Sequence, residues 1–154
     1  MLGLSLLVDA INHPKPPGAT EGTILGPFHS TEAQDMANGE LISHDTSGDP
    51  CLVLCTIQDT SGRPIPGVKV HIWEADSAGQ YDVQRSDRTG PDGRAIITSD
   101  DQGAFWFKAI VPVPYPILCD GPIGQILGEL KRHQYRPGHM HFMFEKPGYD
   151  HLIT

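Results

Sequence analysis

Two histidines separated by one residue, His139 and His141, have the types and the spacing to bind a metal ion. In a strand, alternate side chains point to the same face, so both imidazoles would lie on one side with Cβ atoms roughly 7 Å apart. Both rings could then reach one metal ion at about 2 Å each. The alternative is a pair of half-buried histidines bonded to the backbone, and the spacing is equally consistent with both.

Two tyrosines in irregular segments could add oxygen ligands to this pair. Tyr115 stands between two prolines, which remove backbone freedom on both sides of it. This restriction favours either a preorganised ligand or a rigid turn that packs the ring. Tyr81 follows a Gly-Gln pair and projects from a segment rich in turn-forming residues.

The elements that must position these residues are mostly short strands separated by turns. The 154 residues contain 17 Gly and 14 Pro, which are spread between apolar runs. This pattern predicts a single domain over residues 1–154 that is mainly β, an antiparallel β-sandwich with loops gathered at its ends. Residues 52–58 and 68–75 are the clearest strands, and the turn-rich connection between them predicts that they are antiparallel neighbours.

The remaining elements are predicted from the same patterns. Further strands are predicted over residues 95–99, 103–110, 142–144 and 151–154. Apolar residues at helical spacing predict a short N-terminal helix over residues 1–11, packed on another element, and a short helix over residues 124–133 before the His-x-His strand. Pro137 and Gly138 mark the loop that enters this strand, so the histidines are expected to open it.

Charge and cysteine usage limit the classes of partner. A net charge of -8 without a basic patch argues against nucleic acid or an anionic membrane. Cys51, Cys55 and Cys119 form no CxxC pair and leave an odd thiol, which is typical of a reducing compartment. The apolar N-terminal segment lacks a basic flank and is too short to span a bilayer. We therefore expect a cytoplasmic protein with no signal peptide and no membrane span.

Four motifs, in this order, resemble those of the intradiol ring-cleavage dioxygenases. They are Gly26-Pro27-Phe28-His29, the run 72–76 leading to Gly79-Gln80-Tyr81-Asp82, Tyr115 followed by Asp120-Gly121-Pro122, and Arg136-Pro137-Gly138-His139-Met140-His141. The Pro-Tyr-Pro-Ile form around Tyr115 is most similar to the hydroxyquinol 1,2-dioxygenase branch. The catechol 1,2-dioxygenase branch more often has Gly after this tyrosine.

The resemblance implies one non-haem Fe(III) per chain, and the ligands that it implies are Tyr81, Tyr115, His139 and His141. Two phenolates are hard anionic donors, which agrees with ferric iron. In this family a small aromatic diol or triol binds the iron through adjacent hydroxyls and displaces one tyrosinate, here Tyr115, which then serves as a base. Arg136 would stabilise the electron-rich carbon that O2 attacks. Both oxygen atoms would enter a cis,cis-muconate-type diacid.

The resemblance also implies a substrate pocket and a homodimer. The pocket wall would be formed by Leu6, Asp9, Ile24, Gly26, Pro27, Phe28, Pro116 and Ile117. Asp9 is expected to accept a hydrogen bond from the third hydroxyl of hydroxyquinol. The full-length family forms dimers through a longer helical N-terminal region, of which residues 1–12 would be a remnant, and continues beyond Thr154. We therefore expect a chain that is truncated at both ends.

Two other interpretations remain open. The run over residues 62–73 is also common in prealbumin-like and carbohydrate-binding sandwiches, so a non-catalytic β-sandwich binding module is one alternative. It explains the strands but not the two tyrosines, Arg136 and the histidine pair. The other is an inactive fragment of the dioxygenase that still binds metal, because missing strands would leave a sheet edge and apolar faces exposed.

Overall fold

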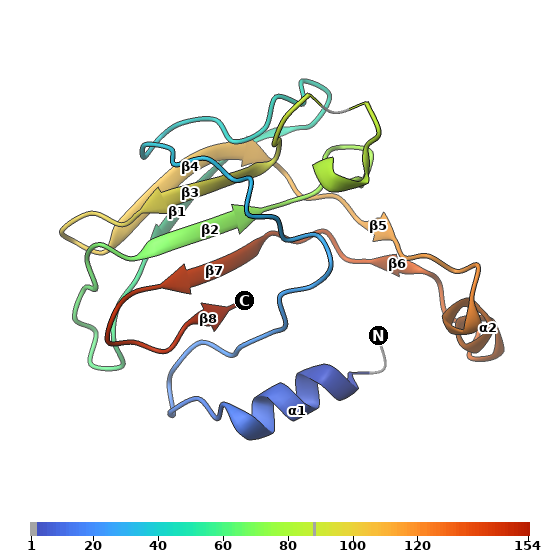
Figure 1. The fold of residues 1–154 in the computed structure, drawn as a ribbon, viewed down its shortest axis with the longest axis horizontal. Helices are drawn as coiled ribbons and strands as arrows, with labels where there is room; N and C mark the ends of the chain where they lie inside the picture. The colour runs from blue at the N-terminus through green and yellow to red at the C-terminus, as the bar shows by residue number, and fades with distance from the viewer. Residues whose placement is uncertain (1–2, 88) are drawn as a thin grey trace.

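The computed structural model, which describes residues 3–87 and 89–154, has two antiparallel layers of strands (Figure 1). One sheet has the strand order β3-β2-β7-β8, with bounds Arg94–Thr98, Lys69–Trp73, His141–Glu145 and Leu152–Ile153. The other pairs β1 with β4, which span Pro50–Thr56 and Ala104–Ile110. A separate two-residue ladder joins β5 (Tyr115–Pro116) to β6 (Tyr135–Arg136). The predicted antiparallel β-sandwich is confirmed.

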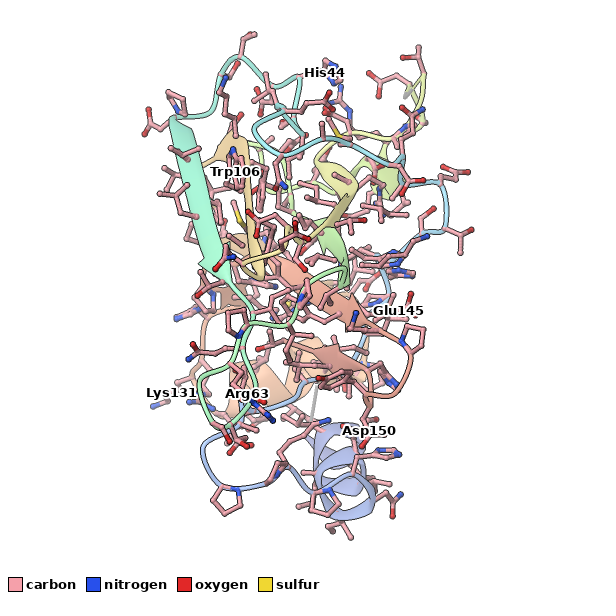
Figure 2. All side chains as sticks on the ribbon, turned by 90° about the vertical axis from the view of Figure 1, so that its left-hand side faces the viewer. His44, Arg63, Trp106, Lys131, Glu145 and Asp150 are labelled. Carbon is pink, nitrogen blue, oxygen red and sulfur yellow. The ribbon has the colours of Figure 1, made fainter. Side chains whose placement is uncertain are left out.

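The main core lies between the two sheets, where side chains fill the space in the side view of Figure 2. Alternate residues of β2 and β4 face this space, because successive side chains of a strand point to opposite faces. The buried members are Ile42, Ile65, Val68, Val70, Ile72, Ala95, Ile97, Phe105, Phe107 and Ala109. As predicted, the 68–75 strand therefore places an apolar face toward the core.

A second, smaller cluster is formed by residues of the opposite alternation, and it contains both tyrosines of interest. Trp73 and Ala75 pack there with Tyr81 and Tyr115, and all four are buried. Trp73 ends β2, in register with Arg94 of β3 on one side and His141 of β7 on the other. The end of β2 therefore packs directly against candidate ligands.

The expectation that strands 52–58 and 68–75 are neighbours is wrong. Each lies in a different sheet, since β1 pairs with β4 and β2 lies between β3 and β7. The connection leads the chain from one layer to the other: the Ile65 N–H donates to the carbonyl of Ile57 after β1, and the Gly67 N–H donates to the carbonyl of Ser99 after β3. Turn residues predict a reversal of direction, and they do not specify which sheet the next strand joins.

Both predicted helices form, with shifted bounds. α1 (Leu4–Asn12) lies at one end of the molecule, beyond β8 in Figures 1 and 2, and none of its described residues is buried. Its apolar stripe is exposed rather than packed, with Leu4 and Ile11 each 68% exposed. α2 (Pro122–Glu129) begins two residues earlier than predicted because Pro122 starts its first turn. Within residues 3–87 and 89–154, no helix has the length and apolar character to cross a bilayer.

Candidate metal centre

The four candidate ligands Tyr81, Tyr115, His139 and His141 form a closed cycle of ring contacts. The ring centroids are 5.5 Å apart for Tyr81 and Tyr115, and 5.3 Å apart for Tyr115 and His139. They are 4.8 Å apart for the two histidines and 6.4 Å apart for His141 and Tyr81. Each ring therefore neighbours two others, although their residues come from three separate segments of the chain.

The two histidines direct the same ring nitrogen toward a common point. Their Nε2 atoms are 3.2 Å apart. The Nδ1 of His139 is 2.7 Å from the carbonyl oxygen of Pro137, to which an Nδ1–H would donate, leaving Nε2 with a free lone pair. Two nitrogens that bind one metal at about 2.0–2.1 Å each can lie up to about 4 Å apart. The observed distance between the two Nε2 atoms therefore fits a shared metal ion. β7 begins at His141, so His139 lies just before the strand.

The environment of His141 favours the neutral imidazole that a metal requires. Its ring stacks on Trp73, with centroids 4.8 Å apart and planes 4° from parallel. Burial lowers the pKa of His141 to about 4, and the neighbouring His139 and Arg136 act in the same direction. The ring is therefore uncharged at neutral pH and is held in one orientation by the indole.

Tyr81 has a buried phenol oxygen that lacks a hydrogen-bond partner among the described residues. The side chain has no exposed surface, and its ring stacks on Phe28 at a centroid distance of 4.5 Å. Burial raises the pKa of the Tyr81 phenol, and the adjacent Tyr115 raises it further. An unpaired buried hydroxyl is costly, and a bound cation would both satisfy this oxygen and favour its anionic form.

The phenol oxygen of Tyr115 accepts a hydrogen bond from Arg136. The two residues are opposite each other in the β5–β6 ladder, and the Arg136 Nη1–H donates to the Tyr115 oxygen at 2.7 Å. The same guanidinium carbon lies 5.6 Å from the centre of the Tyr115 ring. Arg136 therefore contacts a candidate ligand directly, in a short ladder that holds both residues.

A buried ion pair supports the loop that carries Tyr81. Asp82 accepts hydrogen bonds from Arg94, and both side chains are almost completely buried. Arg94 also donates to the carbonyl oxygen of Phe28 at 3.2 Å, so one guanidinium links Tyr81's neighbour to the residue stacked on Tyr81. Burial alone would raise the pKa of Asp82, but its hydrogen bonds with Arg94 and with the Asp92 backbone outweigh this and lower it. No pattern in the sequence indicated Arg94.

Three of the predicted pocket residues lie against the ring cluster. Phe28 stacks on Tyr81, and its ring centroid is 6.4 Å from that of Tyr115. Ile117 packs against the cluster. A Cβ on Gly26 would lie 3.9 Å from Cε1 of His141, so the Gly26 backbone also borders the centre.

The other five predicted pocket residues lie beside these segments or on α1. Pro27 and Pro116 are exposed beside Phe28 and Tyr115. Ile24 is also exposed, and Leu6 and Asp9 lie on α1, where the Asp9 carboxylate is 3.0 Å from the His13 ring nitrogen. No hydrogen bond or ring contact joins these five residues to the four candidate ligands in the described part of the chain.

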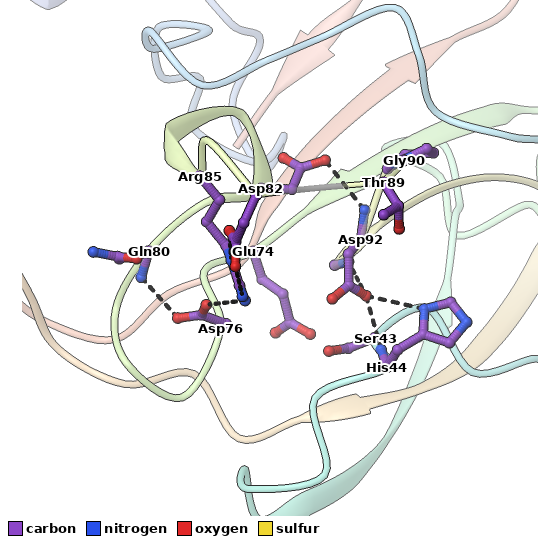
Figure 3. Close-up of a pocket in the computed structure, with 13 residues that line it drawn as sticks. Ser43, His44, Glu74, Asp76, Gln80, Asp82, Arg85, Thr89, Gly90 and Asp92 are labelled. Atoms are coloured by element: carbon purple, nitrogen blue, oxygen red, sulfur yellow. Dashed lines mark hydrogen bonds and ion pairs between the residues drawn. The ribbon is translucent and has the colours of Figure 1, made fainter.

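An acidic cavity of about 350 Å³ is lined by Gln80 and Asp82, the two residues that flank Tyr81 (Figure 3). Most of its carboxylates have partners, for example Asp76 with Arg85 and Asp92 with His44. Glu74 is buried, and burial raises its pKa to about 8, with Asp92 adding to the rise. Among the described residues, no three His, Cys, Asp or Glu side chains are placed to hold a metal ion. The candidate metal centre is the cycle of two phenols and two imidazoles, in which two of the four donors are tyrosine oxygens.

Comparison with known proteins gives consistent matches. A family model described as Dioxygenase matches residues 24–154. An intradiol ring-cleavage dioxygenase of Aspergillus niger is 64% identical over 154 residues, which are 100% of this chain and 47% of that protein. A hydroxyquinol 1,2-dioxygenase of Rhizobium sp. is 44% identical over 156 residues, covering 100% of this chain and 52% of that protein. The chain spans about half the length of these curated relatives.

Solved structures agree with these sequence matches. A hydroxyquinol 1,2-dioxygenase from Pseudomonas putida DLL-E4 has a TM-score of 0.94 at 42% identity, over 99% of this chain and 53% of that one. The wild-type catechol 1,2-dioxygenase of Acinetobacter radioresistens has a TM-score of 0.84 at 30% identity, over 99% and 52% of the two chains. The arrangement of strands around the ring cycle is thus shared with enzymes that carry these two names.

Proposed function

Because this chain belongs to the family of intradiol ring-cleavage dioxygenases, which are oxidoreductases, we propose that it forms the iron-binding part of an enzyme that opens hydroxyquinol with O2. The observation that carries the proposal is the ring cycle, in which two imidazole nitrogens 3.2 Å apart lie beside a buried phenol that has no hydrogen-bond partner among the described residues. The relatives named for hydroxyquinol support this substrate over catechol.

The donor set supports Fe(III) as the cofactor, one ion per chain. Tyr81 and Tyr115 would contribute two phenolate oxygens, and His139 and His141 two neutral nitrogens. Two anionic oxygen donors favour ferric iron, and the complex would keep one net positive charge for an anionic substrate. When bound, the iron would supply the electrophilic and redox chemistry that oxygen insertion requires.

We propose different roles for the two tyrosines, because their surroundings differ. Tyr81 is fixed by stacking on Phe28 and by the ion pair that follows it, so it would remain a ligand throughout. Tyr115 is held by a two-residue ladder, and its oxygen already has an alternative partner in Arg136. Tyr115 would be the exchangeable ligand, and its oxygen would accept a proton from a substrate hydroxyl while Arg136 holds that oxygen nearby.

The overall reaction would break the ring bond between two adjacent hydroxyl-bearing carbons. Both atoms of O2 would enter the product, which is 3-hydroxy-cis,cis-muconate from hydroxyquinol or cis,cis-muconate from catechol. We assign Asp9 as the residue that selects the third hydroxyl, and in this role its carboxylate would exchange His13 for the substrate. A homodimer would cover the exposed apolar stripe of α1.

An inactive iron-binding fragment is the second candidate, because the chain spans about half the length of its relatives. Purified chain loaded with iron should contain one iron and show a visible absorption band from phenolate-to-iron charge transfer. Oxygen uptake with hydroxyquinol, compared with catechol, then separates the two candidates. Colour without oxygen uptake would support the fragment, and a colourless chain that retains no iron would contradict both.

A further inference from the structure

The segment that carries Tyr115 runs between two glycines from the other ligand-bearing loops. Residues 112–115 lead from β4 into β5. Gly79, two residues before Tyr81, lies against one end of this segment, and Gly138, immediately before His139, lies against the other. Thus the Tyr81 loop and the His139 loop each contact residues 112–115 through a glycine, which has no side chain.

Gly79 leaves no room for a Cβ. A Cβ built there would be 2.9 Å from the Cβ of Tyr115, 3.3 Å from its Cα and 3.4 Å from the carbonyl oxygen of Pro114. The residue also has a φ of +76°, in a turn in which its N–H donates to the carbonyl of Asp76. A side chain at position 79 would therefore press on the backbone of the Tyr115 ligand itself.

Gly138 is even more tightly enclosed, and here the neighbours are all backbone atoms. A Cβ would collide with the Pro112 carbonyl group, lying 2.7 Å from its carbon, and would be 3.0 Å from the carbonyl carbon of Val113. Backbone atoms cannot rotate away as the end of a flexible side chain can. A methyl group at position 138 must therefore separate the His139 loop from the Tyr115 segment.

We infer that Gly79 and Gly138 are positioning residues that set the spacing of the three ligand-bearing segments, an inference that rests on the proposed metal centre. Ordinary contacts of a Cβ lie at 3.4–4 Å, so relief of the 2.9 Å contact at position 79 requires a shift of roughly 0.5–1 Å. A metal site tolerates deviations of about 0.2 Å in its bond lengths. One methyl group would therefore spoil the ligand geometry.

Alanine variants with matched controls test this inference in the full chain. Gly79→Ala is compared with Gly62→Ala, where φ is +79° and a Cβ would meet nothing within 4 Å. Gly138→Ala is compared with Gly121→Ala, where a Cβ also meets nothing within 4 Å. We expect at least a tenfold loss of Fe(III) affinity by chelator competition, with a shifted visible band, in Gly79→Ala and Gly138→Ala alone.

A second readout needs no iron and separates this inference from the proposed function. In the metal-free chain, the NMR resonances of the Tyr115 and His139 rings should move in Gly79→Ala and Gly138→Ala and stay unchanged in the two controls. If the parent binds no iron but these resonances move, the proposed function fails and the spacing role stands. Unchanged resonances and iron affinity would overturn the spacing role. Loss of the folded circular dichroism spectrum in both test variants, with both controls folded, would also overturn it.

Discussion

Arg136 donates a hydrogen bond from Nη1 to the phenol oxygen of Tyr115 at 2.7 Å, across 21 positions of sequence. The two residues are also direct partners in the β5–β6 ladder, so the same backbone pairing aligns both side chains. A hydrogen bond that involves a charged group contributes more than a neutral one, typically 1.5–3 kcal/mol. The contact therefore links the proposed catalytic arginine to the ligand proposed to act as a base.

Replacing Arg136 should affect turnover more than iron binding. In Arg136→Gln an amide remains but the charge is lost, and we expect kcat/KM for hydroxyquinol to fall by about 10- to 100-fold. Arg136→Lys, which keeps the charge but not the planar fork, should retain more activity. Oxygen uptake measures the change, and one iron per chain in both variants shows that the centre still forms. Unchanged turnover in Arg136→Gln would exclude the proposed role.

Tyr81→Phe should lose iron while the metal-free protein becomes more stable. The substitution removes a buried hydroxyl that has no partner among the described residues, so we expect the free energy of unfolding to rise by roughly 1 kcal/mol. Urea unfolding of the metal-free chain measures this. Tyr149→Phe is the control, because Tyr149 is 53% exposed. A less stable Tyr81→Phe would mean that the hydroxyl has a stabilising partner.

Breaking the buried pair of Arg94 and Asp82 should cost far more than breaking an exposed one. Arg94→Met removes a buried guanidinium from the Asp82 carboxylate, and we expect a loss of about 3–5 kcal/mol. The control is Arg63→Met, because Arg63 is 80% exposed and its pair with Asp59 should contribute about 0–1 kcal/mol. Chemical unfolding compares the two variants. Equal losses would mean that burial does not determine the strength of the Arg94 pair.

The pH dependence of stability should depend on Glu74. Its folded pKa of about 8 lies above the ordinary value of 4.5, so between these pH values the folded chain holds a proton that the unfolded chain has released. Its contribution to stability is fully present below pH 4.5 and is lost as the pH rises through 8. Other charged residues line the same acidic cavity as Glu74, namely Asp76, Asp82, Asp92 and Arg85.

Glu74→Gln should remove this pH dependence, because the amide stays neutral at every pH. At pH 8.5 we expect the variant to be more stable than the parent by a few kcal/mol, at 1.36 kcal/mol for each unit of pKa difference. At pH 5 the two should be similar, since the parent carboxyl is then protonated when folded. Unfolding curves across this range provide the measurement, with Glu129→Gln on the exposed surface of α2 as the control. Parallel pH profiles for Glu74→Gln and the parent would contradict the raised pKa.

Local patterns in the chain were sufficient for part of the fold. Alternation in the 68–75 strand correctly predicts that Val70 and Ile72 enter the core, because side-chain direction along a strand depends only on position. The partners of that strand could not be predicted, since β2 pairs with β3 and with β7, which lies some 70 residues later in the sequence. Such pairing is decided by which apolar faces can cover one another.

Part of the candidate metal centre could likewise be predicted from the sequence, and part could not. The sequence by itself determined the donor types, because these are properties of residue identity and spacing. The donors are two imidazoles separated by one residue and two tyrosines in turn-rich segments. Only the tertiary structure decided that the four rings meet, that Arg136 contacts Tyr115, and that Gly79 and Gly138 enclose the Tyr115 segment. These contacts join segments far apart in the chain, and their distances depend on close packing in three dimensions, which no local pattern encodes.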